Sequence, residues 1–308
     1  MRSLTHPQIT VLMAVYNGSA FLRQAIDSIL EQTFTDYELL IINDASTDDS
    51  GGIIASYHDP RIRVVNNRTN LGLTKSLNIG LKLAKGALVA RMDADDLSHP
   101  QRLAKQVALM ETDNNYGLIA SAMEVIDAKG AVTSAKKTDY TPEKIYCELQ
   151  FRNCIPHSSV LFKKDLVLKV GGYNPKLRYA QDYALWVRLS QITKINAVNE
   201  SLIKWRNTER NISNLRKKEQ QAIVKEIVTN NIQCLTGKNY PYEYIRFLGG
   251  YWHHLKDIPR REYPRLIGIM QEIIRGLLRK APVFLDRTKL KLLLAAKLDL
   301  IREKLAGK

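Results

Sequence analysis

The chain has 308 residues, 45% of them hydrophobic and 25% charged, so it can bury a substantial core in one large domain with an appendage, or in two domains. Its three cysteines have no paired spacing, which excludes a disulfide framework and a cysteine zinc site and favours a reducing compartment. The polar start lacks the apolar core of a signal peptide, and no window reaches the roughly 18 uncharged apolar residues of a transmembrane helix. We therefore expect a cytoplasmic protein.

The formal charge of +15 is concentrated in the last third of the chain. Residues 201–308 contain 23 Lys and Arg against 10 Asp and Glu, a net +13, which leaves +2 for residues 1–200. A localised positive surface attracts polyanions, either nucleic acid or the anionic inner leaflet of a membrane. A solvated basic face without any partner is the third interpretation.

Apolar strand patterns alternate with helical patterns over the first two thirds of the chain. The predicted strands are 9–16, 37–42, 62–65, 87–90, 118–122 and 159–162, with a hairpin over 124–135. The predicted helices are 19–31, a short one after 48, 73–84, 100–112 and one that opens at Gln181-Asp182. Strands separated by helices of this length indicate βαβ units, so we expect an α/β fold with a mainly parallel sheet flanked by helices.

Helices without strand alternation follow Trp205. The segments 266–280 and 288–305 mix Leu and Ile with Lys and Arg on what would be opposite faces. Basic amphipathic helices can lie in a membrane interface, but they also commonly pack against the parent domain. We accordingly divide the chain into a sheet domain, residues 1–206, and a basic helical extension, residues 207–308, with a membrane contact as one expected role.

Three carboxylates crowd together directly after the strand at 87–90, in the sequence Arg91-Met92-Asp93-Ala94-Asp95-Asp96. Like charges this close repel one another unless a cation or an ionic ligand lies between them. Mg²⁺ and Mn²⁺ prefer carboxylate and phosphate oxygens, so a pair of aspartates at a strand end can hold such a cation against a diphosphate. The alternative is a charged turn in which Asp96 or Ser98 caps the helix that begins at Pro100.

Three polar loops are expected at one rim of the sheet. Ligands bind beyond the carboxyl ends of the strands in open sheets of this type, and Asn17, Asp44 and the Asp93 to Asp95 cluster all follow strands. Asp44 alone is more typical of a helix cap, and Asp182 in a first helical turn could be only a cap as well. Their convergence on one rim favours a binding role.

Seven motifs in this order resemble the family-two inverting glycosyltransferases, which have the A-type nucleotide-sugar fold (GT-A). The resemblance covers about residues 8–206. The motifs are Val15-Tyr16-Asn17, Asn43-Asp44-Ala45-Ser46-Thr47-Asp48, Asn70-Leu71-Gly72, Ala84-Lys85-Gly86, Arg91-Met92-Asp93-Ala94-Asp95-Asp96, Gly171-Gly172-Tyr173 and Gln181-Asp182-Tyr183. The resemblance implies a single Rossmann-like GT-A sheet and transfer of a sugar from a nucleotide-diphospho-sugar donor, usually a UDP-sugar.

The resemblance also implies roles for individual residues. Val15, Asn17 and Asp44 would lie near the base and ribose, and Asp93 and Ala94 beside the ribose and diphosphate. Asp95 would ligate Mg²⁺ or Mn²⁺, and Asp182 matches the catalytic base of a metal-assisted single displacement. Gln181 stands where many relatives have Glu, and Ala14 where proline is frequent. His157 matches a recurrent acceptor-side feature, although a structural histidine explains it as well.

By analogy with similar proteins, the acceptor would be a hydroxyl of a glycan or of a lipid-linked saccharide at the inner face of the cell membrane. A nucleic-acid-binding protein is one competing hypothesis, because aromatic residues that can stack on bases occur in the basic third of the chain. They are Tyr240, Tyr242, Tyr244, Tyr251 and Trp252. No helix-turn-helix, zinc or RNA-binding signature accompanies them, so we expect no nucleic-acid partner.

Two further hypotheses keep the nucleotide-binding sheet and change its chemistry. A nucleotidyltransferase would carry a glycine-rich basic loop after the first strand, and Tyr16-Asn17-Gly18-Ser19 is not one. A non-catalytic sugar-nucleotide binder remains an alternative, which the presence of all the acidic positions disfavours.

Overall fold

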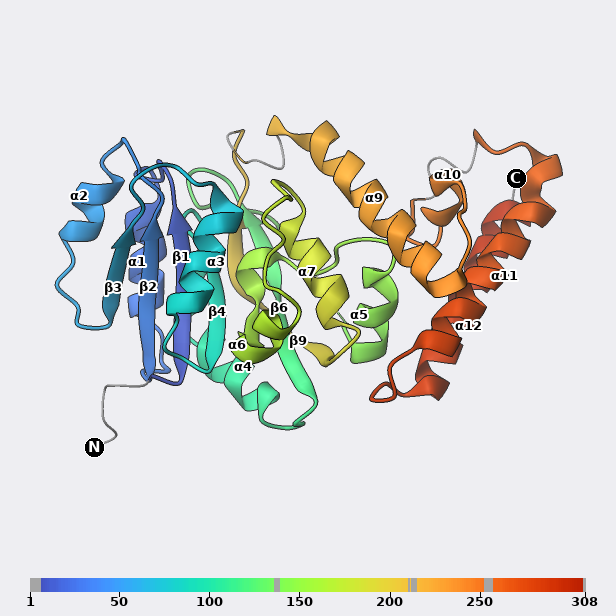
Figure 1. Ribbon diagram of the computed structural model, residues 1–308, viewed down its shortest axis with the longest axis horizontal. Helices are drawn as coiled ribbons and strands as arrows, with labels where there is room; N and C mark the ends of the chain where they lie inside the picture. Colours follow the sequence, from blue (N-terminus) through green and yellow to red (C-terminus); the bar gives the residue numbers. More distant parts are fainter. Residues whose placement is uncertain (1–6, 136–138, 210, 212–214, 252–256, 307–308) are drawn as a thin grey trace.

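The computed structural model describes residues 7–135, 139–209, 211, 215–251 and 257–306 (Figure 1). Within the described residues, the centre of the fold is a nine-stranded sheet. Eight strands follow the order β3-β2-β1-β4-β8-β6-β9-β5, and β7 pairs with β6. The strands are β1 (Ile9–Val15), β2 (Tyr37–Asn43), β3 (Ile62–Asn66), β4 (Leu88–Asp93), β5 (Leu97–Ser98), β6 (Tyr116–Ile126), β7 (Val132–Ala135), β8 (Leu161–Lys163) and β9 (Lys194–Arg206). The α/β class is confirmed.

Strand direction divides the sheet into two halves. The first four strands, β1 to β4, are parallel, as the alternation of strands and helices predicts. The second half is mixed: β8 is antiparallel to both β4 and β6, whereas β9 is parallel to β6. β8 begins beside Ala90, in the middle of β4, and runs back toward Leu88.

Helices cover both faces of the sheet (Figure 1). Before residue 206 they are α1 (Leu22–Leu30), α2 (Ser50–Ala55), α3 (Leu73–Leu83), α4 (Arg102–Met110), α5 (Pro142–Leu149), α6 (Lys164–Lys169) and α7 (Gln181–Leu189), with the 3-10 turn η1 (His157–Ser159). Successive side chains of a strand point to opposite faces, so Val11 and Met13 of β1 pack with α1 and α4, while Leu12 packs with α3. Gly80 lets α3 lie close to β1, because a Cβ there would meet Leu12 Cδ1 at 2.2 Å.

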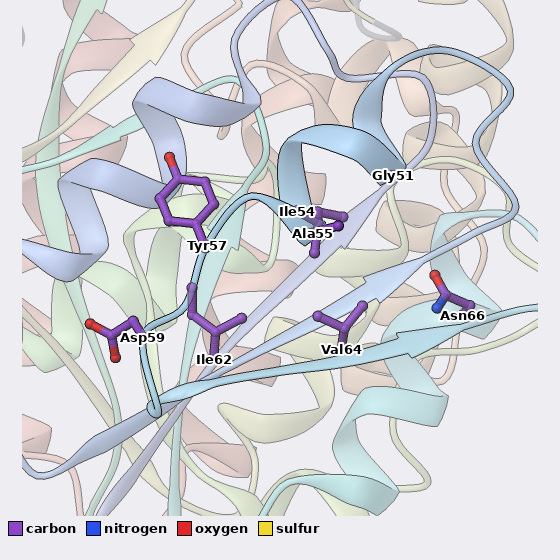
Figure 2. A pocket seen from close by; sticks show the side chains of 8 residues that line it. All are labelled: Gly51, Ile54, Ala55, Tyr57, Asp59, Ile62, Val64 and Asn66. Atoms are coloured by element: carbon purple, nitrogen blue, oxygen red, sulfur yellow. The ribbon is translucent and has the colours of Figure 1, made fainter.

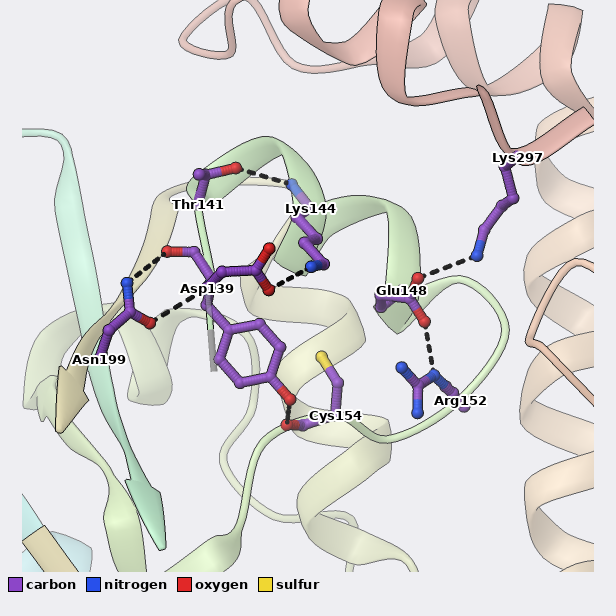
Figure 3. Close-up of polar contacts among 9 residues, drawn as sticks. Asp139, Thr141, Lys144, Glu148, Arg152, Cys154, Asn199 and Lys297 are labelled. Carbon is purple, nitrogen blue, oxygen red and sulfur yellow. Dashed lines mark hydrogen bonds and ion pairs between the residues drawn. The ribbon is translucent and has the colours of Figure 1, made fainter. Parts of the chain in front are cut away.

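The helical extension is present and shares the core on one face of the sheet. Its helices are α9 (Lys217–Thr236), α10 (Tyr242–Ile245), α11 (Tyr263–Lys280) and α12 (Arg287–Ala306), with the 3-10 turn η3 (Arg260–Glu262). α12 docks on α5, where Lys297 Nζ forms a 2.9 Å ion pair with Glu148, which also binds Arg152 (Figure 3). Because the apolar cluster is continuous from the sheet to these helices, the separation of the chain at residue 206 into two domains stays a prediction.

The apolar faces of the last two helices pack against the parent protein, as one of the two interpretations of their sequence predicts. Their buried residues include Leu266, Ile273 and Leu277 of α11, and Leu290, Leu294 and Ile301 of α12. Tyr244 is buried, and Tyr240 and Tyr242 pack against the same cluster, which disfavours base stacking; Trp252 lies outside the described residues. Among the helices that the structure describes, none combines the length and apolarity needed to cross a bilayer.

Candidate active site

Two loops at the carboxyl ends of β1 and β2 are tied together by Asn17. Its backbone N–H donates to Ser46 Oγ (3.1 Å), and its side-chain oxygen accepts a hydrogen bond from the Thr47 N–H (2.8 Å). Asn17 has a φ of 51°, a left-handed conformation that asparagine tolerates better than most residues. Val15 is buried, and its carbonyl accepts from the Asp44 N–H at 2.8 Å.

Asp44 organises the next loop along the rim. It is 2% exposed and accepts hydrogen bonds from Asn67 Nδ2 (2.7 Å) and from the N–H groups of Leu71 (2.9 Å) and Gly72 (2.8 Å). The helix-cap interpretation is therefore wrong for α2, which begins at Ser50, although Asp44 does bind amides at the entry to α3. The Asp44 carboxylate faces protein donors, so Asp44 mainly fixes the conformation of the rim and contributes little to its exposed surface.

The loop after β4 lies beside these two. Asp93 pairs in register with Ala14 of β1, and a Cβ added to Gly18 would lie 3.7 Å from the Ala94 Cβ. Asp93, Ala94 and Asp95 are partly exposed, whereas Asp96 is buried. The three loops that the sequence places at strand ends thus meet at one end of the sheet.

A buried arginine and a serine neutralise part of this loop. Arg91 is fully buried and forms an ion pair with Asp93. Ser158 Oγ lies between Asp93 Oδ2, at 2.5 Å, and Asp96 Oδ2. The other Asp96 oxygen accepts from the backbone N–H of Arg206 at 2.9 Å.

The three carboxylates consequently have different proton affinities. Burial favours the neutral form of Asp93, but the Arg91 charge and the hydrogen bond from Ser158 outweigh it and lower the pKa of Asp93. For Asp95, burial and the charge of Asp93 raise the pKa to about 6. Burial, reinforced by Asp93 and Asp95, also raises the pKa of Asp96 well above the usual range.

Asp182 lies in the first turn of α7. It follows Ala180, which has a left-handed backbone (φ 52°), and its Oδ2 accepts a 2.8 Å hydrogen bond from Asn153 Nδ2. Burial raises the pKa of Asp182, and the negative charge of Asp93 raises it further. Hydrogen bonds from the Tyr183 N–H and from Asn153 lower the pKa but do not outweigh burial.

An aromatic cluster lies between the two acidic groups. His157 Nε2 is 2.9 Å from Tyr173 Oη, and the His157 ring packs edge-on against Tyr173 and Trp186. Burial and the nearby Arg91 charge lower the pKa of His157 to about 3, so its imidazole is neutral. Gln181, also expected on the acceptor side, is buried at the start of α7.

Two cavities lie outside these loops. One of about 320 Å³ lies between α2 and β3 and is lined by Gly51, Ile54, Ala55, Tyr57, Asp59, Ile62, Val64 and Asn66 (Figure 2). The other, of about 500 Å³, lies where α5 and β9 meet the start of α12. Neither cavity is lined by an expected site residue.

Asp95 is suited to a divalent cation by the chemistry of its surroundings. No side chain among the described residues donates a hydrogen bond to its carboxylate, which is crowded by Asp93. Within the same residues, no group of three or more His, Cys, Asp and Glu could hold a metal by itself. A cation at Asp95 would need further oxygen ligands, which a diphosphate provides.

Sequence reasoning missed three residues that build this site. Asn153, Ser158 and Arg206 contact Asp182, Asp93 and Asp95, respectively, from 29, 65 and 111 residues away along the chain. Ser158 is the neighbour of His157, an expected site residue, so the sequence pointed to its segment but not to Ser158 itself. Arg206 and Asn153 have no local pattern that singles them out.

Comparison with known proteins identifies the family of this chain. Residues 10–168 match the sequence profile of glycosyl transferase family 2. The O-antigen biosynthesis glycosyltransferase WbnJ of Escherichia coli is 32% identical over 240 residues, which cover 74% of this chain and 93% of WbnJ.

Solved structures share the fold at low sequence identity. S. aureus TarS 1-349 in complex with UDP-GlcNAc has a TM-score of 0.63 and 16% identity, over 97% of this chain and 91% of TarS 1-349. The mannosyltransferase PcManGT from Pyrobaculum calidifontis, in complex with GDP-Man and Mn²⁺, has a TM-score of 0.59 and 18% identity, over 97% and 82% of the two chains. The fold and the family match define a GT-A glycosyltransferase. This chain belongs to glycosyl transferase family 2.

Proposed function

We propose that the enzyme moves a sugar from a nucleotide-diphospho-sugar, most directly a UDP-sugar, to an acceptor hydroxyl with inversion at the anomeric carbon. The observation that carries this proposal is the set of contacts that joins the two acidic groups. Ser158 binds Asp93 at the end of β4, and the adjacent His157 packs against Trp186 of α7, the helix whose first turn contains Asp182. A donor between them would meet a diphosphate-binding loop on one side and a base on the other.

The three loops at the strand ends provide the proposed donor site. Val15, Asn17 and the loop organised by Asp44 would hold the base and ribose, and the backbone at Ala94 would lie beside the diphosphate. Support comes from their contacts: Asn17 locks the first two loops together, and Gly18 places the first loop against Ala94. The bound UDP-GlcNAc of the TarS structure supports a UDP-sugar as donor.

Asp95 is proposed to bind Mg²⁺ or Mn²⁺. Its half-buried carboxylate lacks a side-chain donor and is repelled by Asp93, which is the environment that a cation would relieve. When bound, the cation supplies Lewis-acid neutralisation of the departing diphosphate. The Mn²⁺ in the PcManGT structure supports the assignment, and activity that is insensitive to EDTA would contradict it.

Asp182 is proposed as the general base. As the acceptor oxygen forms its bond to the anomeric carbon, its proton passes to the Asp182 carboxylate. The bond from that carbon to the diphosphate oxygen breaks, and its electron pair leaves with the nucleotide. Displacement from the side opposite the leaving group inverts the configuration, so one base is sufficient.

The acceptor side is proposed to include His157 and Gln181. A neutral imidazole can accept one hydrogen bond from a sugar hydroxyl or donate one to it. The imidazole of His157 is neutral because its pKa is low. A glycan or lipid-linked saccharide is the proposed acceptor class, supported by the O-antigen biosynthesis role in the name of WbnJ.

Residues 207–308 are proposed to hold the enzyme at the anionic inner face of the membrane. The support is their net charge of +11 together with exposed aliphatic side chains at Val283 and Leu292. Binding to lipid vesicles tests this contact.

The base assignment is tested by Asp182→Asn, which keeps the shape of the side chain and removes its proton affinity. General-base catalysis typically contributes about 10²- to 10⁴-fold, so we expect turnover to fall by that factor while donor affinity is nearly unchanged. The donor is first chosen as the UDP-, GDP- or dTDP-sugar that raises the melting temperature most with Mn²⁺ present. Asp299→Asn, at an exposed position of α12, is the matched control and should retain full activity.

Retained turnover in Asp182→Asn would remove this residue from the mechanism. The non-catalytic alternative makes a different prediction, since such a protein would bind the sugar nucleotide without transferring or hydrolysing it. Release of free nucleoside diphosphate from the wild-type protein and the chosen donor separates the two.

A further inference from the structure

Arg206, the last residue of β9, joins three other segments of the chain through its side chain. The guanidinium is fully buried. Its Nε donates to the carbonyl of Asp95 (2.9 Å), its Nη1 to the carbonyls of Asp127 (3.1 Å) and Ala128 (3.2 Å), and its Nη2 to Gln24 Oε1 (2.8 Å). One side chain therefore connects α1, the β4–β5 loop and the β6–β7 turn.

These acceptors are all uncharged. None of the described carboxylates forms an ion pair with Arg206, and its guanidinium instead lies over the Phe21 ring, 4.3 Å from the ring centroid. Burying a cation without a counter-charge is unfavourable unless hydrogen bonds compensate for the lost water. The guanidinium has five N–H donors in a rigid fork, and the structure uses them to fix backbone positions.

The backbone of Arg206 holds the same loop a second time. Its N–H donates to Asp96 Oδ1 at 2.9 Å, and the other Asp96 oxygen contacts Ser158 Oγ, which also binds Asp93. The Arg206 side chain thus fixes the backbone of Asp95, and the Arg206 backbone fixes the side chain of Asp96. The Asp95 carboxylate itself is left unengaged by these contacts.

We propose that Arg206 is a positioning residue that sets the Asp95 carboxylate for cation binding by clamping its backbone to the β6–β7 turn and to α1. The proposal rests on the assignment of Asp95 as the metal ligand. We assign Arg206 no contact with donor or acceptor, because its side chain is fully buried and its guanidinium donates to protein acceptors. Lysine keeps the charge but presents one point of donation, so it cannot reach carbonyls in three segments at once.

The clamp is tested first without any ligand, by hydrogen exchange of Arg206→Lys. Three amides report on the clamped turn through their hydrogen bonds: Asp127 to Ala131, Gly130 to Asp127 and Asn207 to Ile126. We expect these amides to exchange at least roughly tenfold faster in the variant, since local opening governs exchange.

Arg102→Lys is the matched control for a buried arginine. Arg102 is also fully buried and donates to the carbonyls of Arg91 and Val160 and to Gln106. Its substitution should destabilise the protein while leaving exchange at 127–130 and 207 at the wild-type rate.

The second readout is Mn²⁺ affinity, measured by electron paramagnetic resonance with UDP, and in parallel with GDP and dTDP. Loss of an outer partner of a metal ligand typically weakens the metal 10- to 100-fold, so we expect roughly tenfold weaker binding in Arg206→Lys and no weakening in Arg102→Lys. Gln24→Met, which removes only the Nη2 acceptor, should produce smaller effects in the same direction and covers the case in which Arg206→Lys does not fold.

Wild-type exchange at these amides and wild-type Mn²⁺ affinity in the folded variants would overturn the proposal. A different result would contradict the proposed function and not the clamp. If the wild-type protein binds no Mn²⁺ with any of the three nucleoside diphosphates, the metal assignment of Asp95 is wrong. The hydrogen-exchange rates, which are measured without ligand, still show whether Arg206 clamps the loop.

Discussion

Ser158 explains how three carboxylates can crowd into one loop. Its hydroxyl lies between Asp93 and Asp96 but carries a single proton, so it can donate to only one of them. The arrangement is satisfied when Asp96, whose pKa is raised, keeps its own proton and donates to Ser158, which in turn donates to the ionised Asp93. Asp93 is then balanced by Arg91, which leaves Asp95 as the carboxylate open to a ligand.

The raised pKa of Asp182 predicts the acid limb of the activity profile. The base must be ionised, and burial together with Asp93 holds its proton to a higher pH than the ordinary value of 3.8. We expect kcat/KM to fall as pH decreases through a pKa above 3.8. Asn153 donates to Asp182 and favours the ionised form, so Asn153→Ala should move this limb to higher pH.

The measurement is kcat/KM with a saturating metal concentration at pH values from 4.5 to 8. Asn115→Ala is a suitable control, because that amide binds only the nearby Asp113 on the surface. An acid limb at the same pH in Asn153→Ala and in the wild type would show that the limb belongs to another group.

The sequence reveals the acidic residues of the site but not the groups that control them. Asp93 and Asp95 stand out because they follow an apolar strand, and Asp182 because it belongs to an ordered set of motifs. Ser158 and Arg206 contact them only through the folded chain, at separations of 65 and 111 residues. No periodicity connects positions so far apart, so these partners required the structure.

At the scale of elements, hydrophobic periodicity predicts where strands and helices lie better than how they are joined. The predicted helix at 73–84 is observed as α3, Leu73–Leu83, and the predicted strand at 37–42 as β2, Tyr37–Asn43. The direction of β8 was not predictable, because a buried strand has the same apolar pattern whether its neighbours are parallel or antiparallel. β9 is not among the predicted strands, although it pairs along the whole of β6.

The hairpin of α11 and α12 is the element best suited to meet a membrane. Val283 in the connecting loop is 91% exposed and Leu292 in α12 is 66% exposed. Nearby cations are Arg279, Lys280, Arg287, Lys289 and Lys291. Among the residues that the structure describes, Arg279 and Lys280 bind backbone carbonyls and no carboxylate, so their charge is available to anionic lipid.

The corresponding experiment measures binding to phosphatidylglycerol-containing and phosphatidylcholine vesicles. We expect salt-sensitive binding to the anionic vesicles only, and roughly tenfold weaker binding after Val283→Ser together with Leu292→Ser, since each aliphatic side chain contributes at most about 1.5–3 kcal/mol. Val132→Ser, at a 52% exposed position of β7, is the matched control. Equal binding of the double variant, or tighter binding of DNA than of vesicles, would contradict the proposed contact.

At the scale of the whole molecule, charge and chemistry are separated along the chain. The first 200 residues are nearly neutral and contain every residue proposed to contact the donor, the cation or the acceptor, and the last 108 carry a net charge of +13. The apolar core nevertheless continues from the sheet into α9, α11 and α12, so the basic surface has a fixed orientation relative to the site. The composition of the sequence predicted the charge separation, whereas the shared core depends on contacts such as Lys297 to Glu148 between distant segments.

The most direct measurement is a crystal structure of the Asp182→Asn variant with an intact sugar nucleotide and Mn²⁺. The account predicts a diphosphate between the loop after β1 and the loop after β4, with the cation on Asp95. It also predicts that residue 182 faces the anomeric carbon from the side opposite the leaving oxygen. A donor bound instead in the cavity between α2 and β3 (Figure 2), or a residue 182 that points away from the sugar, would contradict the account.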